Sequence, residues 1–181
     1  MKKLIVLLAL LGFSNSYADS LRVSTTAAAF ADQVGDISRP GLLLKFDLPV
    51  ELRNARIDLA YLRFKVDADT IRKSIPLLVQ PMLQAWASGQ RLASLSNASV
   101  SADHSNLGRL TLKSGKGEIE ITHIIQAWQK GELQNLGLLV YPARQKPKSI
   151  QPNTLPTGGV AELDIFYTPQ EKPDSTIQVK Q

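Results

Sequence analysis

Residues 119–141 read IEITHIIQAWQKGELQNLGLLVY, and this segment decides the predicted fold. Ile119 and Ile121 lie in one phase of an alternating pattern, which is typical of a strand with one buried side. Thr122 follows with a side-chain oxygen suited to cap the N-terminus of a helix. Asn135 and Gly137 then indicate a turn before a second apolar strand that begins at residue 138. The segment therefore predicts a strand, a short helix around residues 122–130, and another strand.

The predicted helix has one apolar side. Ile124, Ile125 and Trp128 recur at helical spacing, so their side chains share one face. Gly131 can adopt the left-handed conformation that ends so short a helix. We therefore expect Trp128 to be a core residue, and His123 to be an exposed residue at the start of the helix.

The N-terminus has the features of an export signal. Lys2 and Lys3 precede a short apolar stretch at residues 4–12, and small residues surround a plausible cleavage site after Ala18. The stretch is too short to span a bilayer. We predict that residues 1–18 are a bacterial signal peptide, and that the protein is periplasmic or extracellular with no transmembrane segment after removal of the signal.

Composition sets further limits on function. The chain has 181 residues, no cysteine and a formal net charge of +5, of which Lys2 and Lys3 contribute two charges. Its stability must therefore come from burial and backbone pairing. The mild basicity favours acidic partners without requiring them, and we expect no nucleic acid partner because the sequence contains no basic motif interleaved with aromatic residues.

Short alternating segments separated by turns continue along the rest of the chain. They lie at residues 21–25, 42–48, 55–66, 75–80, 107–113 and 160–167. This spacing predicts an all-β fold, an antiparallel β-sandwich of jelly-roll type with one short helix. We expect a single domain over residues 19–168, a polar tail at 169–181 and a proline-rich loop at 142–159. Residues 81–89 suggest a helical turn carrying Trp86.

Three motifs occur in the order of a known family. They are LLLKFDLP at 42–49 followed by ARIDLAYL at 55–62, then EITHIIQAW at 120–128 with NLGLLV at 135–140, and finally LDIFY at 163–167. Together they resemble the DNRLRE domain family, from about Leu42 to Tyr167. The resemblance implies an extracellular β-sandwich similar to a carbohydrate-binding module, and by implication a polysaccharide ligand.

Several residue types in the sequence could take part in catalysis or ligand binding. Trp86 and Trp128 could stack on sugar rings, but core packing explains both better. His104 and His123 lie too far apart in sequence for a recognisable metal motif, and no serine lies in a nucleophile elbow. We therefore predict no enzymatic activity and no cofactor, although paired carboxylates of a glycan hydrolase or lyase remain an alternative.

A structural calcium ion is the remaining cofactor alternative. Asp32 and Asp36 flank Gly35, and Asp67 lies close to Asp69, so either pair could supply the oxygen ligands that calcium takes.

Strand phase gives the sharpest hypothesis about function. If the leucine faces point inward, one outward face gathers positive charge with a tyrosine, provided that the strands share a sheet. The candidate ligand-binding residues are Lys45, Tyr61, Arg63, Lys65, Arg109 and Lys113. Such a stripe would suit an acidic polysaccharide, such as a uronate polymer, through hydrogen bonds to its carboxylates. The alternative function is that of a structural subunit of a surface or matrix assembly with an envelope protein partner, bound through an exposed edge strand or the basic loop at 144–148.

Overall fold

The computed structural model describes residues 18–36, 39–65, 75–111, 116–143 and 161–170. Ten strands and one α-helix lie in these ranges, together with two short 3-10 helices. The bounds are β1 Asp19–Ser24, β2 Ala27–Ala31, β3 Gly41–Lys45, η1 Val50–Asn54, β4 Ala55–Lys65, β5 Ile75–Pro81, β6 Arg91–Leu92, η3 Asn97–Ser99, β7 Asn106–Thr111, β8 Lys116–Glu120, α1 Thr122–Lys130, β9 Leu138–Pro142 and β10 Glu162–Pro169.

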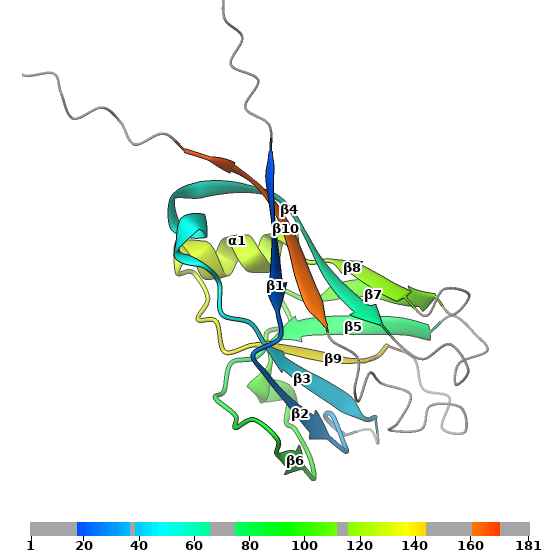
Figure 1. Cartoon of the computed structure of the whole chain (residues 1–181). Helices are drawn as coiled ribbons and strands as arrows, with labels where there is room; N and C mark the ends of the chain where they lie inside the picture. The colour runs from blue at the N-terminus through cyan, green and yellow to red at the C-terminus, as the bar shows by residue number, and fades with distance from the viewer. Residues whose placement is uncertain (1–17, 37–38, 66–74, 112–115, 144–160, 171–181) are drawn as a thin grey trace, which may run out of the picture.

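The strands form a sandwich whose two layers are joined along one side. Pairing runs in the order β1-β10-β4-β8-β7-β5-β9-β3-β2-β6 (Figure 1). The first layer consists of β1, β10, β4 and β8, and the second of β7, β5, β9, β3, β2 and β6. The pairing of β7 with β8 joins the layers. From β3 to β5 and from β8 to β10 the chain changes layer at each connection, as in a jelly roll. The predicted all-β sandwich with one short helix is confirmed.

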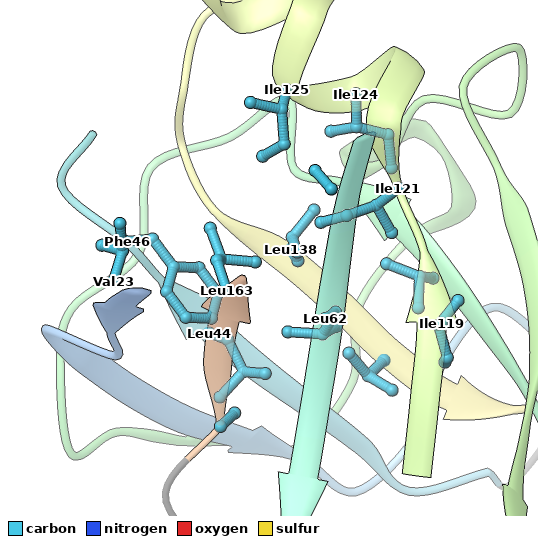
Figure 2. Close-up of a cluster of buried hydrophobic side chains, with 14 of the residues drawn as sticks. Val23, Leu44, Phe46, Leu62, Ile119, Ile121, Ile124, Ile125, Leu138 and Leu163 are labelled. Carbon is cyan, nitrogen blue, oxygen red and sulfur yellow. The ribbon is translucent and has the colours of Figure 1, made fainter. Parts of the chain in front are cut away.

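A single apolar core fills the space between the layers. Figure 2 shows side chains from both layers and from the helix converging there, among them Phe46, Leu62, Leu138 and Leu163. Phe46, Leu62, Leu138 and Leu163 have no exposed surface. The phase of Phe46, Leu62 and Leu163 follows the alternation predicted for residues 42–48, 55–66 and 160–167, because neighbouring residues in a strand point to opposite faces.

The predicted helix is present as α1, with one detail changed. Ile124, Ile125 and Trp128 are buried on its inner face, and Gly131 ends it with a positive φ of 72°. The prediction that Thr122 caps the helix is wrong. Its Oγ1 instead accepts a hydrogen bond from the backbone N–H of Ala60 at 3.0 Å. Thr122 therefore joins the start of the helix to β4.

A second apolar cluster covers the outside of the second layer. Residues 82–105 leave β5 and pack over β2, β3 and β9, where β6 pairs with β2 in parallel. Leu43 and Leu139 point away from the main core into this cluster and are fully buried. Strands β3 and β9 are therefore buried on both faces, and so their sequences are almost continuously apolar. No helix forms at residues 81–89, where Trp86 packs against the cluster from a segment without regular secondary structure.

Candidate functional site

The outward side of the first layer carries polar and charged side chains, unlike the covered outward side of the second layer. We call it the open face, and it consists of the outward residues of β1, β10, β4 and β8. Inward residues such as Ala60, Leu62 and Ile165 are buried, so the alternate positions of these strands point outward. Backbone pairing places Arg22, Asp164, Tyr61 and Glu120 in one row across the four strands. The next row places Arg63 between Glu162 and Glu118.

Ion pairs run across the open face. The Nε of Arg22 donates to Oδ1 of Asp164 at 2.8 Å, and its Nη2 donates to Oδ2 at 3.3 Å. On the other side of Asp164, Nη1 of Arg63 contacts Oδ2. The Nε of Arg63 then donates to Oε2 of Glu118 at 2.9 Å. Charge therefore alternates across the face from β1 to β8.

Asp164 lies at the centre of these ion pairs and is their least exposed member. Its side chain is only 10% exposed, whereas those of Arg63 and Glu118 are 39% and 49% exposed. The hydrogen bonds from Arg22 and the positive charges of Arg63 and Arg22 lower the pKa of Asp164 below its ordinary value, against the opposing effect of its burial. The Asp164 carboxylate is thus held ionised between two guanidinium groups.

Two half-buried aromatic rings lie beside the ion pairs. Tyr61 and Phe166 pack edge to face, with ring centroids 6.5 Å apart. The guanidinium carbon of Arg63 lies 6.0 Å from the centroid of the Tyr61 ring, within the range of cation–π attraction. The open face therefore combines a partly exposed aromatic pair with a guanidinium group held in place.

The structure brings together two of the six residues predicted for ligand binding. Tyr61 and Arg63 lie side by side on the open face. Lys45 is exposed but belongs to β3 in the second layer, so it does not share this face. For Lys65 and Arg109 only the backbone position is described: Lys65 pairs with Lys116, and Arg109 pairs with Glu118. Lys113 lies outside the described residues.

Sequence reasoning missed Phe166 and the two acidic partners of Arg63. The signal for Phe166 and Asp164 was present, because Leu163 and Ile165 alternate with them in the last strand. Glu118 alternates in the same way with Ile119. What the sequence could not supply was which strands pair, and hence that these carboxylates neutralise the predicted basic stripe at Arg63.

Neither the tryptophans nor the histidines belong to the four strands of the open face. Trp128 is 7% exposed in the main core. Trp86 is half-buried and donates its Nε1 hydrogen to the carbonyl of Leu136 at 2.8 Å. The expectation that His123 is merely an exposed helix start is wrong. Its ring is half-buried and stacks on that of His104, with centroids 6.3 Å apart.

The first of the two predicted calcium positions contains an ion pair. Asp32 lies 2.8 Å from a guanidinium nitrogen of Arg91, and Asp36 is exposed. Asp67 and Asp69 lie outside the described residues. Within the described ranges, no group of three or more histidine, cysteine, aspartate or glutamate side chains is placed to hold a metal ion.

No protein-family model and no curated protein matches this chain. The resemblance to the DNRLRE family therefore stays a prediction that depends on the three motifs. Among the helices of the described residues, none has the length and apolar character needed to cross a membrane.

Proposed function

We propose that this protein is an exported, non-catalytic module of the DNRLRE type that binds polysaccharide on its open face. The observation that carries the proposal is the placing of the Tyr61–Phe166 pair beside the guanidinium of Arg63 on an exposed sheet surface. The outward side of the second layer offers no such surface where residues 82–105 cover it.

The chemistry of a sugar ring suits this arrangement. One side of many pyranose rings is lined by C–H groups, which pack against partly exposed aromatic rings such as Tyr61 and Phe166. Hydroxyl groups at the ring edge can pair with the carboxylates and guanidinium groups that surround the aromatic pair. A rigid strand scaffold holds these groups in place before the ligand arrives, which lowers the entropic cost of binding.

An acidic polysaccharide is the favoured ligand. A uronate carries a carboxylate beside an apolar ring face, and on the open face the guanidinium group of Arg63 lies beside the ring of Tyr61. Guanidinium groups bind carboxylates through charge-assisted hydrogen bonds. Backbone pairing also sets Lys65 next to Lys116 on the strand ends beyond Arg63, and both residues are positively charged.

Affinity gel electrophoresis tests the proposal. The protein is run through gels containing neutral or acidic polysaccharides, and we expect retardation by an acidic one. Arg63→Ala should abolish or strongly weaken it, whereas Arg53→Ala, an exposed arginine in η1, should not. If no polysaccharide in the panel retards the wild-type protein, the proposed function is wrong.

The alternative is a structural or interaction subunit, and strand β1 favours it. β1 lies at one end of the pairing order and aligns with β10 over six residues without a register shift. A regular edge strand of this kind can accept a strand from another protein. Pull-down from cell envelopes would support this alternative if it returned one stoichiometric partner whose binding is unaffected by Arg63→Ala.

A further inference from the structure

We infer that Glu118 is a built-in competitor for the ligand, occupying on Arg63 the position that a uronate carboxylate takes when it binds. This inference rests on the proposed function and names the residue that sets its affinity for acidic glycans. It follows from the different ways in which Arg63 is held by its two acidic partners.

Asp164 is the permanent partner of Arg63. It is nearly buried and is bonded to Arg22 as well as to Arg63. Removing it would leave two guanidinium groups without their shared counter-ion. A ligand has little access to this carboxylate and cannot readily replace it. Asp164 therefore positions Arg63.

Glu118 is the exchangeable partner. It accepts a single hydrogen bond from Arg63, from Nε at 2.9 Å, and about half of its side chain is exposed. Exposed ion pairs of this kind contribute little to stability, because solvent screens them and the side chains lose entropy. An incoming carboxylate can take over the bond from Nε while Glu118 turns into solvent. The ligand then exchanges one carboxylate for another at the same guanidinium.

This exchange predicts that a substitution at Glu118 improves binding. Glu118→Gln removes the competing charge while keeping the size of the side chain. We expect it to bind oligogalacturonate about two- to five-fold more tightly than the wild type, the range that corresponds to an exposed ion pair. Binding of an uncharged galactan oligomer of equal length should change little, because no carboxylate has to be exchanged.

Glu120→Gln is the matched control. Glu120 lies two residues away on β8, is exposed, and forms no ion pair with the described residues. Its substitution removes the same charge from the same strand without freeing Arg63. At physiological salt we expect a gain below about 1.5-fold, because screening weakens general attraction between exposed charges. Equal gains for the two variants would show general charge repulsion and overturn the inference.

Isothermal titration of the whole protein with the two oligomers decides the matter, and thermal unfolding checks that both variants fold. A wild type that binds oligogalacturonate, together with a Glu118→Gln variant that binds no more tightly, overturns the inference and leaves the proposed function standing. Binding of the neutral oligomer alone has the same consequence. A wild type that binds neither oligomer and no polysaccharide in the gel panel overturns both.

Discussion

The two outward surfaces of the sandwich differ because a segment of the chain covers one of them and leaves the other exposed to solvent. On the second layer, residues 82–105 bury Leu43 and Leu139 under a separate apolar cluster. On the first layer, Arg22, Asp164, Arg63 and Glu118 form a row of ion pairs next to two aromatic rings. The covered surface of the second layer adds to stability, and the open face of the first layer keeps polar side chains accessible to a ligand. A sandwich with both faces covered in this way would have nowhere on its sheets to bind a ligand.

The difference is visible in strand patterning. β9 is apolar at every position and β3 at all but its last, whereas β4 and β10 alternate. Continuous apolar runs indicate burial on both faces, and alternation indicates one wet face.

Truncating a buried side chain on the covered surface should lower the free energy of unfolding the most. Leu43→Ala removes a fully buried side chain from the second cluster and leaves a cavity. We expect the free energy of unfolding to fall by about 2–5 kcal/mol in urea denaturation. Leu107→Ala makes the same chemical change at a side chain that is 65% exposed, and it should stay within about 0.5 kcal/mol of the wild type. Similar losses for both variants would mean that residues 82–105 do not seal the second layer.

Weakening the attachment of residues 82–105, which cover the second layer, should have an intermediate effect on the free energy of unfolding. Trp86→Phe keeps an aromatic ring but deletes the hydrogen bond from Nε1 to the carbonyl of Leu136. We expect a loss of about 1 kcal/mol, the usual contribution of such a bond. Amide exchange should also quicken at Leu95, whose N–H donates to the carbonyl of Gln33 and so ties residues 82–105 to the chain that follows β2. Unchanged exchange at this amide would contradict the idea that Trp86 fastens the segment.

On the open face the expected change is smaller and depends on pH. Because the pKa of Asp164 is lowered in the folded protein, its contribution to stability is present above the unfolded value of about 4 and is lost as pH falls through the folded value. Asp164→Asn should therefore lower stability at pH 7 and flatten the decline of stability below about pH 4.

Asp58 supplies the control for this measurement. Hydrogen bonds from Thr168 and Arg56 lower the pKa of Asp58 as well, so part of the acid dependence should survive in Asp164→Asn. The double variant with Asp58→Asn should flatten the curve further. An acid dependence in Asp164→Asn that equals that of the wild type would show that the ion-pair row does not stabilise the folded state.

Local pattern was enough to predict most of the fold. The alternation of β4 and the helical spacing around Trp128 each depend on residues close in sequence, and both predictions are confirmed. Strand β2 was missed because its four alanines carry little information about burial. Thr122 was predicted wrongly because its hydrogen-bond partner, Ala60, is 62 residues away.

The site was harder to predict because it depends on strand pairing. The alternation of β4 placed Tyr61 and Arg63 outward. It could not show that β3 belongs to the other layer, so that Lys45 does not share the open face. Asp164 is separated from Arg22 by 142 residues, and Glu118 from Arg63 by 55. Pairs so distant follow from the order of strands in a sheet, which periodicity does not specify.

We propose that the open face, and not the covered surface, binds carbohydrate. The most direct measurement is a titration of the isotopically labelled protein with oligogalacturonate, followed by the amide resonances. Binding at the open face should give shifts centred on Tyr61, Arg63 and Phe166, with little change in residues 82–105. Shifts confined to residues 82–105, or no shifts at an oligomer concentration that saturates retardation in gels, would contradict it.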